Sequence, residues 1–291
     1  MRLRGDLESL PEIDGRKWTF LYVIQGHFKA NVHLERRLGM SSLKSSARLG
    51  RLLRQDDWEN LGRPTQEQVC DAIDEGRLEE AKLLARYMVP ENKALHDFFC
   101  DLIWNILSEV ANRHGEEEMA DILKKSQETW MMKRTWKGFL TLPVEERVQI
   151  TAEIMRSHRC GPKQDGTIQV AEDEDRYSII MDPCGSGGRM RRGDPFERTP
   201  SRLGPPYNFG ATKAARDWNW NKQGVAYYCI HCVFNEILPM EWGGHPLWVT
   251  DYPEDADKPC VWHFYKTAEK IPEIYYTRVG RKKPGPREGK Y

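Results

Sequence analysis

Residues 160–181 read CGPKQDGTIQVAEDEDRYSIIM, and the expected fold changes within this stretch. The cluster 160–166 is rich in glycine, proline and polar residues, which interrupt regular secondary structure. Residues 167–171 and 176–181 then read as two strands joined by the acidic turn 172–175. Before the cluster, apolar residues recur instead at the three-to-four spacing of helices. The sequence therefore predicts an α+β protein whose helical part precedes its strands.

The helical part is expected to cover residues 64–158. Residues 75–88 form an amphipathic pattern that we expect to end before Pro90, because proline disrupts a helix interior. The clearest helix comes next and ends at Gly115, and it carries one apolar stripe. The residues of this stripe are Leu95, Phe98, Phe99, Leu102, Ile103, Ile106, Leu107 and Val110. Two further helices are predicted, at 116–128 and at 144–156.

These patterns divide the chain into four regions. They are a partly ordered N-terminal arm over 1–63, a helical bundle over 64–160, a cysteine-rich α+β domain over 161–280 and a basic tail over 281–291. In the third region, antiparallel strands are expected to pack on a helix over 225–238 that bears two cysteines.

Composition and charge favour a cytoplasmic protein. The 291 residues include 44 basic and 44 acidic ones, so the net charge is zero and gives no general attraction to nucleic acid. No apolar run reaches eighteen residues, which excludes a transmembrane helix, and we expect no membrane partner. The start lacks an apolar signal core, so we do not expect export. Seven cysteines, an odd number, favour reduced thiols over a disulfide framework. The oligomeric state is left open.

The C-terminal region concentrates the residues that carry chemistry. Cys184, Cys229, Cys232 and Cys260 all follow residue 180. Cys229 and Cys232 would share one face of a helix, as two metal ligands do. All four suit a closed zinc site, and three of them would leave an open catalytic position. Two other interpretations stay open, since free cysteines also serve as small buried apolar residues or as nucleophiles.

A glycine-rich turn with three arginines follows the first of these cysteines. In residues 184–192, CGSGGRMRR, the glycines permit tight backbone turns, and Arg189, Arg191 and Arg192 could clamp a carboxylate. The alternative is a solvated basic loop within the long connection 184–222.

Two histidines outside this region are candidate general bases or ligands, His96 and His158. For each the alternative is a packed or capped histidine. On a helix, His231 would be turned away from the face shared by Cys229 and Cys232. In a strand, Cys260 and His263 would point to opposite faces, so that only one of them could join the site.

The order of these elements resembles a known family. Two strands ending near Cys184, a helix bearing Cys229 and a late strand starting CVWHF at Cys260 are similar to the L-2-amino-thiazoline-4-carboxylic acid hydrolase-like family. The similarity covers about residues 165–268, although family members carry an acidic residue near the position of Cys232. It implies hydrolysis of a C–N or C–S bond in a small heterocyclic or amide-like acid, with these three cysteines in the site.

The sequence is compatible with two classes of function. We expect a hydrolase or lyase for a small anionic substrate, with Cys184 or Cys229 as nucleophile or metal ligand and a histidine as proton shuttle. The alternative is a zinc-stabilised binding module whose arginine loop and basic tail contact nucleic acid or an acidic protein. The absence of a basic face on any predicted helix argues against nucleic acid as the partner.

Overall fold

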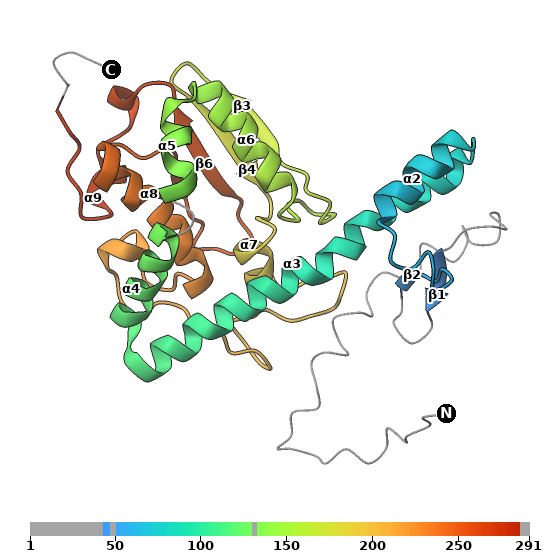
Figure 1. Ribbon diagram of the computed structural model, residues 1–291. Helices are drawn as coiled ribbons and strands as arrows, with labels where there is room; N and C mark the ends of the chain where they lie inside the picture. Colours follow the sequence, from blue (N-terminus) through green and yellow to red (C-terminus); the bar gives the residue numbers. More distant parts are fainter. Residues whose placement is uncertain (1–42, 47–50, 130–132, 286–291) are drawn as a thin grey trace. The chain divides into compact units, whose positions relative to one another are not determined.

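The computed structural model describes residues 43–46, 51–129 and 133–285 (Figure 1). The chain divides into two compact units, Met1–Met88 with Asp194–Thr199, and Val89–Gly193 with Pro200–Tyr291. Helices make up most of the described first half, and a four-stranded antiparallel sheet lies in the second, so the predicted α+β class is confirmed. None of the described helices combines the length and the apolar composition needed to cross a bilayer.

The first unit contains a hairpin that the sequence did not predict. Strands β1 (Leu43–Ser46) and β2 (Arg51–Arg54) pair antiparallel and are followed by helix α2 (Thr65–Asp74). The buried guanidinium of Arg54 donates hydrogen bonds to Thr65 Oγ1 at 2.7 Å and to the Leu61 carbonyl at 2.7 Å. These bonds link the end of the hairpin to the start of α2. The rest of the predicted arm, up to residue 42, lies outside the described residues.

Helix α3 (Leu78–His114) runs without a break through Pro90. The prediction that a helix ends before this proline was therefore wrong. Proline inside a helix costs about 3 kcal/mol, because it lacks an N–H and clashes with a carbonyl of the preceding turn. Burial on both sides of Pro90 offsets this cost, since Leu84 and Tyr87 precede it and Trp104 follows it, all at most 5% exposed.

The second unit packs helices on one antiparallel sheet. The sheet has the order β3-β4-β6-β5, with β3 (Gln169–Glu172), β4 (Arg176–Met181), β5 (Val249–Asp251) and β6 (Cys260–Tyr265). Its helices besides α3 are α4 (Glu116–Gln127), α5 (Lys133–Thr141), α6 (Val144–Arg156), α7 (Gly187–Arg192), α8 (Ile230–Gly243) and α9 (Ile274–Thr277). Short 3₁₀ turns lie at η3 (Asp217–Asn219), η4 (Tyr227–Cys229) and η5 (Ala268–Lys270).

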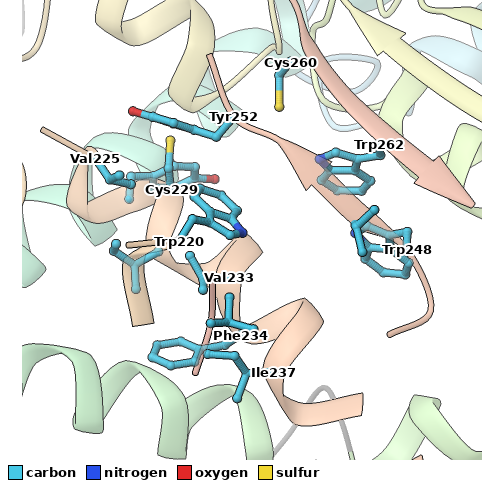
Figure 2. Packing of buried hydrophobic residues seen from close by; sticks show 14 of the residues in the cluster. Trp220, Val225, Cys229, Val233, Phe234, Ile237, Trp248, Tyr252, Cys260 and Trp262 are labelled. Carbon is cyan, nitrogen blue, oxygen red and sulfur yellow. The ribbon is translucent and has the colours of Figure 1, made fainter. Parts of the chain in front are cut away.

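One hydrophobic core joins the helices and the sheet of this unit. Helix α6 packs against β4 and β6, and α8 packs against α4 and β5 (Figure 1). The same core includes Trp104 of α3, Met119 of α4, Ile179 of β4 and Phe234 of α8, which Figure 2 shows beside Ile237. The sequence placed a domain boundary at 160/161, whereas the structure keeps both sides of that position in one unit. The turn there is itself buried, because Cys160 is fully inaccessible.

Candidate active site

A cavity of about 440 Å³ lies in the second unit, between α6, α7, the N-terminal end of α8 and the starts of β5 and β6. All four of the cysteines singled out in the sequence line it: Cys184, Cys229, Cys232 and Cys260. Figure 2 shows two of them, together with aromatic residues that form much of the wall. The aromatic lining residues are Phe139, Trp220, Tyr228, Trp248, Tyr252 and Trp262.

The sheet register positions two of the cysteines. Met181, the last residue of β4, pairs with Cys260, the first of β6, so the segment that leads to Cys184 leaves the sheet beside Cys260. Cys260 and Trp262 both line the cavity because alternate residues of a strand share a face. His263 lies on the other face, where its ring contacts Ser178 Oγ at 2.8 Å. Cys260 and His263 therefore point to opposite faces of β6, as expected, and only Cys260 lines the cavity.

The glycine turn packs its backbone directly on the site. A Cβ at Gly185 would lie 1.4 Å from the His158 carbonyl oxygen, and one at Gly187 would lie 2.3 Å from Cys229 Sγ. A side chain at position 185 would collide with backbone, and one at position 187 would have to displace the Cys229 sulfur. The turn leads into α7, a helix that the sequence analysis did not expect in this part of the connection 184–222.

Only one of the three predicted arginines lines the cavity. Arg191 is 5% exposed, and its guanidinium donates hydrogen bonds to the Tyr252 hydroxyl and, at 2.8 Å, to the Pro253 carbonyl. Arg189 donates instead to the Gly185 carbonyl at 2.9 Å and pairs with Asp97. The third, Arg192, pairs with Asp182 at 2.8 Å and bonds the backbone of the loop before β6.

The cavity wall carries polar atoms that have no hydrogen-bond partner among the described residues. They are Nε of Arg191, Oγ1 of Thr151, Oγ1 of Thr250 and the indole nitrogens of Trp248 and Trp262. The two tryptophan rings are stacked at 5.2 Å, with 14° between their planes. A buried polar group without a partner costs about 1–3 kcal/mol, and five such atoms belong to residues that line this one cavity.

The two predicted histidines differ in their position relative to the cavity. His158 lines the cavity, and its Nδ1–H donates to the Ile154 carbonyl at 3.0 Å, so the neutral ring keeps a lone pair on Nε2. Burial lowers the pKa of His158. The ring of His96 contacts that of His158, with centroids 5.7 Å apart, and its Nδ1 lies 2.9 Å from Asp97 Oδ1. His96 does not line the cavity.

A third histidine, His231, forms a thiol–imidazole pair that the sequence analysis missed. Its Nδ1–H donates to the Tyr228 carbonyl, and its Nε2 lies 3.3 Å from Cys232 Sγ. Burial lowers the pKa of His231 to about 4 and raises that of Cys232 well above its usual value, so the pair is a neutral S–H···N contact. The expectation that His231 is turned away from the cysteines was wrong. The hydrogen bond to Tyr228 folds the ring back toward Cys232, and their adjacency in CIHC was the available signal.

The remaining thiols differ in environment. Burial raises the pKa of Cys229 to about 12, while the nearby charge of Arg191 acts in the opposite direction. Burial likewise raises the pKa of Cys260 well above its usual value. Cys184 is half-buried, and its Sγ lies 3.8 Å from Ser186 Oγ.

The four sulfurs do not form a ready-made zinc site. Among the described residues, no three of them lie within 4.8 Å of one another, whereas Zn–S bonds of about 2.3 Å require sulfurs about 3.8 Å apart. Zinc binding would need these side chains to rotate. It stays a prediction, which elemental analysis of the purified protein tests.

Comparisons with models of protein families, with curated proteins and with solved structures give no match to this chain. The resemblance of residues 165–268 to the thiazoline-carboxylate hydrolase-like family therefore also stays a prediction.

Proposed function

We propose that the protein is an enzyme that cleaves a C–N or C–S bond of a small anionic substrate, with a cysteine thiol of the cavity as nucleophile. This proposal depends mainly on one observation. The buried cation of Arg191, with an unpartnered Nε, lies in the wall of the same cavity that holds four thiols and two imidazoles. Perturbed titratable groups that converge on a cavity are typical of active sites.

Arg191 supplies the site for the negative group. Among the described residues no carboxylate pairs with it, and its guanidinium carbon lies 4.5 Å from the centroid of the Tyr252 ring. A substrate carboxylate that accepts a hydrogen bond from Nε would compensate this charge. The stacked faces of Trp248 and Trp262 suit a planar substrate, and their indole N–H groups can donate to its polar atoms.

The thiols and histidines supply the chemistry. In the first step the sulfur attacks a carbonyl carbon that bears the C–N or C–S bond, and a histidine Nε2 accepts the thiol proton. The leaving nitrogen or sulfur departs with the bonding electrons and receives that proton. Water then attacks the resulting thioester and gives a proton to the same histidine, which returns it to the departing cysteine sulfur. Both His158 and His231 have the neutral ring that this role requires.

The structure offers three candidates for the attacking sulfur. Cys232 has a base at 3.3 Å. Cys229 precedes α8, where the partial positive charge of the helix N-terminus and Arg191 both favour a thiolate. Cys184 lies at the glycine turn and is the more accessible of the predicted pair, Cys184 and Cys229.

The experiment is a substrate screen joined to mapping of the reactive thiol. Small amide, thiazoline and thioether acids are incubated with the protein, and the products are followed by mass spectrometry. In parallel, iodoacetamide labelling with peptide mapping ranks the cysteines by rate. We expect alanine at one of the cavity cysteines to abolish turnover, and substrate to protect the same residue from labelling.

The matched control is Cys70→Ala, because Cys70 is exposed in α2 and lies outside the cavity. This variant should keep full activity. Turnover that survives alanine at each of Cys184, Cys229, Cys232 and Cys260 in turn would overturn the cysteine mechanism.

A further inference from the structure

The apolar stripe of α3 faces outward. Six of its eight predicted residues are 40–59% exposed, whereas the buried edge of the helix consists of Cys100, Trp104, Leu107 and Ala111. We call the exposed set the α3 stripe. Its members are Leu95, Phe98, Phe99, Leu102, Ile103 and Ile106. All of them belong to the second unit.

The size of the α3 stripe is that of an interaction surface. Six large side chains at this exposure present roughly 500 Å², and the largest apolar patch of an ordinary monomer is about 300–600 Å² and is often functional. Pairing two such stripes would bury about 1,000 Å² in total, which reaches the lower limit for specific association. The α3 stripes of two copies together therefore supply the buried area that a specific dimer needs.

The charges that flank the α3 stripe are arranged for self-pairing. Eleven residues complete three helical turns, so Glu91, Leu102 and Arg113 lie on one line along α3, with Leu102 midway. Within its own helix Arg113 bonds Glu109 at 2.9 Å. If two copies pack antiparallel with the two-fold axis at Leu102, Glu91 of each copy meets Arg113 of the other, which it would share with Glu109. At each end of the contact, a glutamate of one copy then lies beside an arginine of the other. A parallel pairing would instead place like charges together.

We propose that the protein forms a homodimer through antiparallel packing of the α3 stripes of two copies. The contact is isologous, with Phe98, Phe99 and Leu102 at its centre and one Glu91–Arg113 pair at each end. Aromatic and aliphatic residues at the centre with charges at the rim is the usual composition of such interfaces. This inference does not depend on the proposed chemistry of the cavity.

The first test is sedimentation equilibrium of the full chain at several concentrations. We expect a dimer for the natural sequence, and a dissociation constant raised at least about 100-fold by Phe98→Glu/Leu102→Glu. The matched control is Ile122→Glu, an apolar residue of α4 that is 43% exposed and lies outside the stripe. It should leave the dimer unchanged. Circular dichroism establishes that each variant is folded.

The second test exchanges charges and does not depend on the apolar residues. Glu91→Arg alone and Arg113→Glu alone should each weaken the dimer, because each places like charges at both ends. The double variant should restore it. A mixture of the two single variants should form a heterodimer, since every end then joins opposite charges.

Two results would overturn the inference. One is a monomer at every concentration. The other is a dimer that the stripe and charge variants leave intact. If the natural chain is a monomer, and deletion of residues 1–42 increases binding of a hydrophobic dye in a Phe98-dependent manner, the occupant of the stripe is the chain's own N-terminal segment instead.

Discussion

The backbone of Gly187 lies against the sulfur of Cys229, so closely that a Cβ at position 187 would be 2.3 Å from Sγ. Gly187 begins α7, and Cys229 immediately precedes α8. This contact links the two elements that bring Arg191 and the CIHC cysteines to one cavity. It makes the absence of a side chain at position 187 a condition for the site.

Gly187→Ala should therefore displace the Cys229 thiol. Overpacking a filled site of this kind costs about 1–3 kcal/mol of unfolding free energy, and the labelling rate of Cys229 should change as its sulfur moves. Urea unfolding and peptide mapping after alkylation measure the two effects. Gly204→Ala is the control, because a Cβ there meets nothing within 4 Å. Equal unfolding free energies for the two variants would contradict the close contact.

Arg191→Gln should remove anion binding, whereas Arg192→Gln should not. Hydrogen bonds to a charged group contribute about 1.5–3 kcal/mol, which corresponds to a loss of affinity of about 10- to 150-fold. Benzoate serves as a planar anionic probe and benzamide as its neutral counterpart, and both are titrated by calorimetry. Arg192 is the matched control, since its own side chain does not line the cavity and bonds Asp182 and the Lys258 carbonyl. Equal affinity of the natural protein for benzoate and benzamide would refute the role of Arg191.

The sequence predicted the parts of this structure that local patterns determine. The strands 176–181 and 260–265 and the helices 116–127 and 144–156 follow from periodicity, to within one or two residues at most ends. The failures occurred where tertiary packing overrides local preference. Pro90 lies inside α3 because buried residues hold the helix on both sides. Periodicity identified the apolar stripe of α3, but it did not indicate that most of the stripe is exposed and that the opposite edge, with Trp104, is buried.

The candidate site was predictable as a set of residues but not as a geometry. Clustering along the chain was enough to select the four cysteines that line the cavity. It was not enough to separate Arg191 from Arg189 and Arg192, because which of three neighbouring side chains faces a cavity depends on how α7 is placed. The His231–Cys232 contact depends on a hydrogen bond to the Tyr228 carbonyl, which no spacing rule contains.

Acid should destabilise the protein partly through His231. Its pKa in the folded state is about 4, below the ordinary value of 6.5, because burial disfavours the charged ring. Between these two pH values the unfolded chain binds a proton that the folded protein does not, so the unfolding free energy falls as the pH falls. The loss should reach about 2–3 kcal/mol near pH 4. His231→Gln should reduce this slope in urea titrations from pH 7 to pH 4, while His114→Gln, at the exposed end of α3, should keep it. An unchanged slope in His231→Gln would contradict a buried neutral ring.

Thr212→Val should lower stability, whereas Thr250→Val should not. Both threonines are buried, with Thr250 0% and Thr212 2% exposed, but among the described residues only the hydroxyl of Thr212 has hydrogen-bond partners. It accepts from the Val225 amide at 3.0 Å and donates to the Lys222 carbonyl at 3.3 Å, so valine there should cost about 1–3 kcal/mol. The hydroxyl of Thr250 lies unpartnered in the cavity wall, and valine there should leave the unfolding free energy unchanged or raise it by up to about 1 kcal/mol. The same variant should weaken binding of any ligand that uses this hydroxyl, which the benzoate titration measures. A loss of stability in Thr250→Val as large as that in Thr212→Val would mean that its hydroxyl is satisfied without a ligand.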